Sequence, residues 1–79
     1  MILSKYIELI ESMQDSGYFK DNEGQALISN VTYYLWKLIF KSHKYHYISE
    51  ENKTKKHFRN YLNKHNIKVK GIIDEYIRY

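Results

Sequence analysis

The sequence predicts one all-α domain over residues 1–79, a compact bundle of about four helices around a central hydrophobic helix at about residues 22–41. Three observations favour this fold. Apolar residues recur every three to four positions in several separate stretches, which is the period of helices that bury one face. Proline is absent and glycine occurs only three times, which suits long helices joined by short turns. Hydrophobic residues make up 43% of the chain, enough for a small core.

The first helix is expected at residues 2–14. Gly17 follows it, at the position where a glycine in the left-handed conformation often ends a helix. Tyr18 and Phe19 come next, and aromatic side chains in such a connection usually fold back over the core; an exposed anchor is the alternative. The residues that share the inward face of this helix are Ile2, Tyr6, Leu9, Ile10 and Met13.

The helix at about 22–41 carries two apolar stripes. The wider stripe consists of Leu27, Val31, Tyr34, Leu35 and Leu38, with Ile28 and Ile39 at its sides. A second stripe, on almost the opposite side, consists of Tyr33, Trp36 and Phe40. Because a surface helix needs only one apolar stripe, this helix is expected to be covered from two sides.

The start of the central helix has the residues of a cap. The Asn22 side chain can accept a hydrogen bond from a free N–H of the first turn, and Gln25 stands where a capping box takes Glu or Gln. Leu35 and Leu38 lie on the wider stripe farther along the helix. They are therefore expected to be among the most buried residues of the chain.

Residues 42–49 lack a helical stripe and are expected to form a connection, with a short strand near 44–48 as the alternative. A third helix is expected at about 50–65. Ser49 can cap it, and Glu50 and Glu51 then lie near the positive end of the helix dipole. Its inward-facing residues are expected to be Thr54, Phe58, Tyr61, Leu62 and His65.

Asn66 marks a turn, and a fourth helix is expected at about 68–78. Gly71 lies inside this stretch, where glycine costs roughly 1 kcal/mol relative to alanine. A close helix contact at Gly71 would account for it. The residues of this helix expected to be buried are Val69, Ile72, Ile73, Tyr76 and Ile77.

Charge is distributed unevenly along the chain. Residues 1–40 hold three lysines against five acids, whereas residues 41–79 hold ten Lys or Arg against four acids, in agreement with the formal net charge of +4. Such asymmetry suggests that the C-terminal half meets an anionic partner. The alternative is that its basic side chains only solvate the outer faces of short helices.

Several function classes are disfavoured by the sequence. Without cysteine, neither a disulfide nor a thiolate metal site can support the fold. His43 and His46 form an H-x-x-H pair, but zinc needs three or four ligands and no carboxylate lies at ligand spacing. Glu50–Glu51 and Asp74–Glu75 are neighbours in sequence, which point in different directions on a helix. No catalytic residue, cofactor or metal is therefore expected, and the chain is interpreted as a non-enzyme.

No apolar run approaches the roughly 20 residues of a membrane span, and no signal peptide is visible. A cytoplasmic protein without membrane partner is therefore expected.

The composition favours a protein-binding module. Nine tyrosines and one tryptophan exceed what a core of this size is expected to hide, and both residues are enriched at interfaces. A small inhibitor or regulator of the immunity-protein, antitoxin or phage anti-defence type would suit such a chain, with an acidic patch on its protein partner. The stripe of Tyr33, Trp36 and Phe40 is either covered by the last two helices or forms the interface. The candidate partner-binding residues are Tyr33, Trp36, Phe40, Tyr45, Tyr47, Lys53, Lys56, Arg59, Lys64, Lys68 and Lys70.

Nucleic-acid binding is the alternative hypothesis. Residues 58–79 resemble a helix–turn–helix in outline, but His65 and Glu75 fall where that pattern places apolar residues. The lysines of this half could neutralise phosphates. Base readout favours guanidinium groups, and only Arg59 and Arg78 supply them here, so phosphate contact is expected rather than sequence reading.

Overall fold

The computed structural model describes residues 3–40 and 47–78, the side chains of residues 47–49 excepted. Four helices account for most of these residues: α1 (Leu3–Asp15), α2 (Asn22–Ile39), α3 (Tyr47–Lys64) and α4 (Ile72–Arg78). No strand occurs among the residues described. The predicted all-α bundle is therefore confirmed. The alternative of a strand near 44–48 fails at residues 47 and 48, which belong to α3, while 44–46 lie outside the described part.

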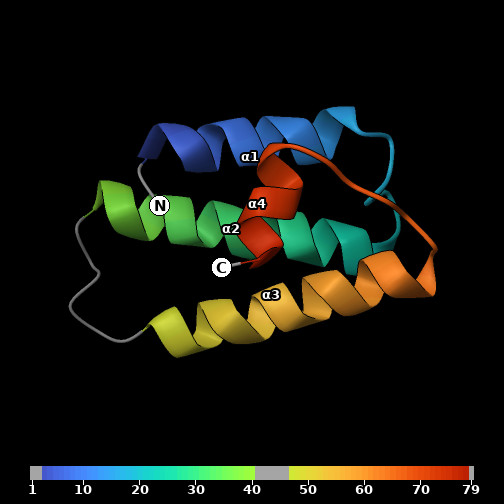
Figure 1. Ribbon diagram of the computed structural model, residues 1–79. Coiled ribbons are helices and arrows are strands. Elements are labelled where there is room, and N and C mark those ends of the chain that lie inside the picture. The colour runs from blue at the N-terminus through green and yellow to red at the C-terminus, as the bar shows by residue number, and fades with distance from the viewer. Residues whose placement is uncertain (1–2, 41–46, 79) are drawn as a thin grey trace.

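The four helices form a compact bundle with α2 between α1 and α3. Helices α1, α2 and α3 run side by side with alternating direction, and the short α4 lies across them (Figure 1). Helix α2 packs against α1 and α3, and α4 also packs against α1 and α3. Helix α2 thus has a neighbour on each side, and α4 bridges those two neighbours. The expectation that both apolar stripes of α2 are covered is wrong, because Tyr33, Trp36 and Phe40 are exposed.

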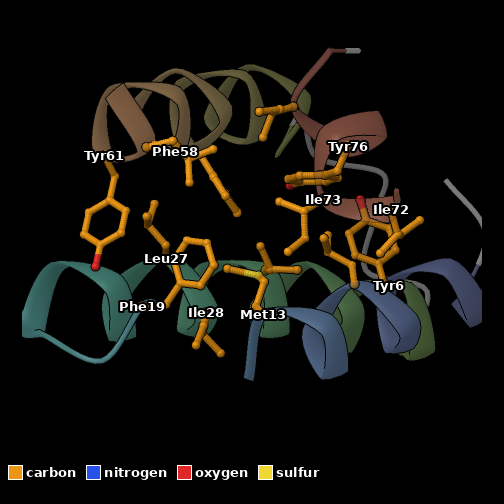
Figure 2. Packing of buried hydrophobic residues seen from close by; sticks show 14 of the residues in the cluster. Tyr6, Met13, Phe19, Leu27, Ile28, Phe58, Tyr61, Ile72, Ile73 and Tyr76 are labelled. Atoms are coloured by element: carbon orange, nitrogen blue, oxygen red, sulfur yellow. The ribbon is translucent and has the colours of Figure 1, made fainter. Parts of the chain in front are cut away.

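Aromatic side chains form the centre of the core. Phe19, from the connection between α1 and α2, packs edge-on against Phe58 with 5.2 Å between ring centroids and stacks on Tyr61 at 5.5 Å. All three are buried, and Figure 2 shows them between α2 and α3. The expectation of a lid over the core is confirmed for Phe19. It is wrong for Tyr18, whose side chain points outward and is 47% exposed.

The wider stripe of α2 is buried only in part. Leu27, Val31 and Tyr34 are buried, but Leu35 and Leu38 are only half-buried, so the expectation that they are among the most buried residues is wrong. In Figure 1, α4 crosses the middle of the bundle, away from the last turn of α2. Leu38 lies in that last turn, and Leu35 lies toward one side of the stripe, so both receive less cover.

The N-cap of α2 is Asp21, one residue before the expected cap, Asn22. The cap is Asp21, whose Oδ1 accepts a hydrogen bond from the Gly24 N–H at 2.7 Å, and Asn22 is the first helical residue. Gln25 does not complete a capping box, because its side chain donates to the Phe19 carbonyl oxygen at 2.8 Å. A side chain at Gly24 would meet the Phe19 backbone, since an added Cβ would lie 2.3 Å from Phe19 Cα.

Two other helix starts differ from expectation. Helix α3 begins at Tyr47, so Ser49 lies inside its first turn rather than before it. Helix α4 begins at Ile72, because Gly71 has a φ of 67° and this left-handed backbone ends the approach to the helix instead of continuing it. The expected close contact at Gly71 is wrong, since nothing lies within 4 Å of an added Cβ. Gly17 and Asn66, with φ of 80° and 54°, do occupy the predicted turns.

Candidate protein-binding face

Exposed apolar side chains gather on one part of the surface. In the described residues, seven large hydrophobic side chains are strongly exposed, and six of them come from the first turns of α1, the second half of α2 and the C-cap of α2, Phe40. Trp36 is 50% exposed and Phe40 is 69% exposed. We refer to the six as the α1–α2 face: Leu3, Ile7, Tyr33, Trp36, Ile39 and Phe40.

The helical period and the packing place these residues on one side of the bundle. Val31 is fully buried, and Tyr33, Trp36 and Phe40 lie on the side of α2 turned away from it. On α1, Ser12 lies beside the segment that leads into α4. Leu3 lies on the opposite side of α1 from Ser12, because nine residues correspond to two and a half helical turns. Since α1 packs between α4 and α2, Leu3 lies toward α2. The antiparallel course brings the start of α1 beside the end of α2 (Figure 1).

The aromatic side chains of this face pack on one another along the helix surface. The Trp36 and Phe40 rings are stacked, with centroids 5.6 Å apart and an interplanar angle of 18°. The Lys37 Nζ lies 5.0 Å from the centroid of the Tyr33 ring, a cation–π geometry. The alternative that α3 and α4 cover this stripe is wrong, because all three aromatic rings are exposed. These aromatic rings therefore pack on their neighbours along the helix and remain accessible.

The α1–α2 face is large for so small a chain. If a large apolar side chain offers roughly 200 Å² in full, the six exposed fractions together leave roughly 600 Å² in contact with water. That value is at the upper end of the largest apolar patch on a typical monomer, about 300–600 Å². Patches of this size usually mark a site of interaction with another molecule.

Three of the predicted basic residues form a stripe on the outer surface of α3. Lys53, Lys56 and Lys64 are all exposed there, and we call these three the lysine stripe. The hydrogen bond between Thr54 Oγ1 and Tyr34, at 2.8 Å, fixes the side of α3 that faces α2. Lys53, one position before Thr54, lies next to that side. Lys53 and Lys64, whose Nζ lies 3.9 Å from Glu23 Oε1, therefore border α2, whereas Lys56 lies farther around the outer surface of α3.

The other predicted residues are placed elsewhere. The Arg59 guanidinium donates to the Ile77 carbonyl oxygen at 2.5 Å. A cation at the carbonyl end of a helix is stabilising, so Arg59 has a structural role at the end of α4. Lys68 and Lys70 lie in the connection between α3 and α4 and line a groove of about 410 Å³ at the end of α1. Tyr45 lies outside the described residues. Tyr47 begins α3, but its side chain is also outside them.

The sequence analysis missed half of the α1–α2 face. Leu3 and Ile7 are spaced by one helical turn beside the main stripe of α1, and this spacing was the available signal. Ile39 was placed at the side of the buried stripe of α2, yet it is 42% exposed. The antiparallel packing of α1 on α2, which a pattern within one helix does not reveal, joins these residues to the aromatic stripe.

Buried tyrosines use a second set of polar contacts that sequence reasoning did not find. Glu51 Oε2 accepts hydrogen bonds from the Tyr6 hydroxyl at 2.5 Å and from the Tyr76 hydroxyl at 2.8 Å, joining α1, α3 and α4. Burial and the nearby Glu51 carboxylate raise the pKa of Tyr76. Lys55 Nζ lies 4.7 Å from the Tyr76 ring centroid, and burial lowers the pKa of Lys55. The four tyrosines that are buried in the described residues are those that the helical patterns placed inward: Tyr6, Tyr34, Tyr61 and Tyr76.

A surface cluster links the start of α2 to the end of α3. The Tyr61 hydroxyl donates to Asp21 Oδ1 at 2.9 Å, and His65 Nε2 lies 3.7 Å from Asp21 Oδ2. Burial and the bond to Asp21 raise the pKa of Tyr61 to about 12. The Gly24 N–H and the Tyr61 hydroxyl lower the pKa of Asp21. His65 is exposed beside this cluster, so its expected inward placement is wrong, because α3 ends at Lys64.

Two further findings concern the described residues taken together. In residues 3–40 and 47–78, no group of three or more His, Asp or Glu side chains is arranged to hold a metal ion. No helix in the same residues is both long and apolar enough to cross a membrane.

Comparison of the chain with protein-family models, curated protein sequences and solved structures finds no match in any of the three.

Proposed function

We propose that this chain is a non-catalytic protein-binding module, a small inhibitor or regulator that docks on its partner through the α1–α2 face. The observation that carries the proposal is the gathering of six exposed large apolar side chains where α1 and α2 lie side by side. Action in the cytoplasm, by an immunity-protein, antitoxin or anti-defence type of inhibition, belongs to the same proposal.

The chemistry of the face supports binding to a protein. Aromatic side chains dominate interface hot spots because they offer large contact area and lose little rotamer entropy. Trp36 and Phe40 are already stacked in the free chain, so less ordering remains to be done on binding. Covering these rings would remove apolar surface from water at about 25 cal/mol per Å² before the costs of association.

The basic surface beside the face supports a partner with an acidic patch. Lys53 is exposed beside α2, Lys56 is exposed farther around α3, and Lys37 Nζ lies over the Tyr33 ring. Charges at the rim of an interface mainly accelerate encounter by long-range attraction, whereas buried aromatic anchors set the dissociation rate. The two groups of residues would therefore act on different steps of binding.

Nucleic-acid binding is the second candidate, and the lysine stripe is the observation that favours it. Three exposed lysines on one face of α3 could neutralise phosphates. Binding through three phosphate contacts should weaken by roughly 40-fold between about 50 and 200 mM salt, whereas an aromatic-anchored protein contact should weaken less. Titration with generic duplex DNA at both salt concentrations distinguishes the two.

Site-specific photo-crosslinking tests the first proposal. A benzophenone amino acid replaces Trp36 in one variant and Glu75, exposed on α4 away from α2, in the matched control. In an extract of the cell that encodes the chain, we expect position 36 to give one dominant protein adduct that unlabelled wild type removes by competition. Equal adducts from both positions, or micromolar DNA binding with the steep salt dependence above, would contradict the proposal.

A further inference from the structure

Three parallel bands of different chemistry lie side by side on the bundle. Helix α1 contributes the aliphatic side chains of Leu3 and Ile7, and α2 contributes the aromatic stripe centred on Trp36. Helix α3 contributes the lysine stripe. Since α2 lies between α1 and α3, the aromatic band lies between the aliphatic and the basic band (Figure 1).

The basic band lies on only one flank. Lys37 is placed toward α3, because it lies three positions after Tyr34, whose hydroxyl bonds Thr54 on α3. Together with the lysine stripe, this flank holds four lysines against three acids, Asp21, Glu23 and Glu50. Lys64 Nζ lies 3.9 Å from Glu23 Oε1 and is paired there. The acids on α1 are Glu8, Glu11 and Asp15, and α1 carries one lysine. The two flanks of the aromatic band therefore differ in the sign of their charge.

We propose that this three-band surface takes an amphipathic helix of the partner protein, with acidic residues along one edge. The apolar side of that helix lies on the α1–α2 face, and its acids meet Lys53 and Lys56. This inference rests on the proposed protein-binding function and adds the chemistry of the segment that is bound.

The dimensions of the aromatic band fit such an occupant. Tyr33 and Phe40 are seven residues apart on α2, about 10 Å along the helix axis. An amphipathic helix presents anchors at i, i+3 or i+4, and i+7 over the same distance. A second copy of this chain fits less well by charge, because it would bring another formal net charge of +4 to the contact.

A displayed peptide library tests the proposal even while the partner protein is unidentified. The library holds helical peptides of about 16 residues, with an apolar stripe and random residues at all other positions. Selection against the wild-type chain should enrich Asp and Glu along one edge of the stripe. Trp36 is the only tryptophan of the chain, so its emission reports binding at this face directly. A blue shift of that emission should give the dissociation constant of each selected peptide.

Charge reversal locates the acidic edge. The variant with Lys53→Glu and Lys56→Glu should bind the selected peptides at least about tenfold more weakly. The matched control reverses Lys68 and Lys70, which gives the same change in net charge at a different part of the surface, and should change binding less than about threefold. Selection against the first variant should instead enrich Lys and Arg in the peptides. All four lysines are exposed, so circular dichroism should show folded proteins.

Several outcomes would overturn this inference. They are the absence of any binder, binders without acidic enrichment, or equal losses from the two charge reversals. A dimer in sedimentation that dissociates when Trp36→Ser is introduced would assign the face to a second copy. A blue shift with phosphatidylglycerol vesicles but not with peptides would assign it to a lipid surface. The crosslink from position 36 decides the proposed protein-binding function separately from all of these.

Discussion

Buried tyrosine hydroxyls provide much of the polar bonding between the helices. Tyr6 and Tyr76 both donate to Glu51, Tyr34 bonds Thr54, and Tyr61 donates to Asp21. In the described residues no buried side-chain nitrogen or oxygen lacks a partner. A buried hydroxyl left unpaired would cost about 1–3 kcal/mol. Arrangements of the helices that break one of these hydrogen bonds are therefore disfavoured by about that amount.

Gly24 lies so close to the Phe19 backbone that replacing it by alanine should destabilise the fold. Alanine is favoured over glycine in a helix by about 1 kcal/mol, yet its Cβ would lie 2.3 Å from Phe19 Cα. We expect Gly24→Ala to lower the free energy of unfolding by about 1–3 kcal/mol, because the buried Phe19 backbone must shift. Urea denaturation followed by circular dichroism measures it. The control is Ser29→Ala, exposed on α2, which should stay within about 0.5 kcal/mol of wild type. Equal effects at both sites would contradict the packing described.

The Asp21 carboxylate should contribute to the fall in the free energy of unfolding at acid pH. Its pKa is lowered from the ordinary value of 3.8 in the folded chain, so its contribution is present above about pH 4 and is lost as pH falls through the folded pKa. Asp21→Asn keeps a good helix cap but removes the titration. We therefore expect a shallower loss of stability in Asp21→Asn than in wild type between pH 5 and pH 2, measured by urea denaturation at each pH. Parallel curves would show that Asp21 does not act in this way.

At the scale of single elements, α2 is divided between inside and outside. One side of it packs against α1 and α3, and the other carries exposed aromatic rings. The helical period shows from the sequence which residues share a side of α2. It does not show which sides the neighbouring helices cover, because that depends on contacts between residues far apart in the chain.

The same distinction explains which predictions succeeded. The inward faces of α1 and α3 were predictable, since each of these helices has one clear apolar stripe, and Phe58, Tyr61 and Leu62 are indeed buried. The start of α4 was missed, because its place depends on the left-handed backbone at Gly71. Whether Trp36 is covered also could not be read from the sequence. It is exposed because α4, which has only 7 residues, packs on α1 and α3 and does not cover this side of α2.

Two leucines of equal size test the assigned packing of α1 and α2. Leu9 on α1 is fully buried, so Leu9→Ala should lower the free energy of unfolding by about 2–5 kcal/mol. Leu35 on α2 is only half-buried, and Leu35→Ala should cost at least about 1 kcal/mol less, because part of its surface already meets water. Chemical denaturation of both variants under one condition makes the comparison. A larger loss at Leu35 would contradict the orientation of α2.

At the scale of the whole molecule, the bundle keeps a large apolar area outside its core. The buried cluster joins side chains from all four helices and from the α1–α2 connection. The α1–α2 face lies outside this cluster, although its residues would be chemically suited to a core. An apolar area of this size on a small chain is an aggregation hazard unless another molecule covers it. We infer that the face is retained for binding rather than for folding.

The variant with Trp36→Ser and Phe40→Ser should separate folding from binding. Serine has a helix propensity close to that of tryptophan and phenylalanine, and both replaced side chains are at least half exposed. We expect the free energy of unfolding to stay within about 0.5 kcal/mol of wild type, measured by denaturation followed by circular dichroism. A loss of about 2 kcal/mol or more would show that these rings support the fold.

The most direct test of the proposed function is the affinity of this folded double variant for the partner identified by the crosslink at position 36. Truncation of an interface hot spot typically costs about 2 kcal/mol or more, which corresponds to about 30-fold in the dissociation constant. Isothermal titration calorimetry should therefore show binding by the wild-type chain and at least about 30-fold weaker binding by the Trp36→Ser, Phe40→Ser variant. Dissociation constants within twofold of each other would contradict the assignment of the α1–α2 face as the binding surface.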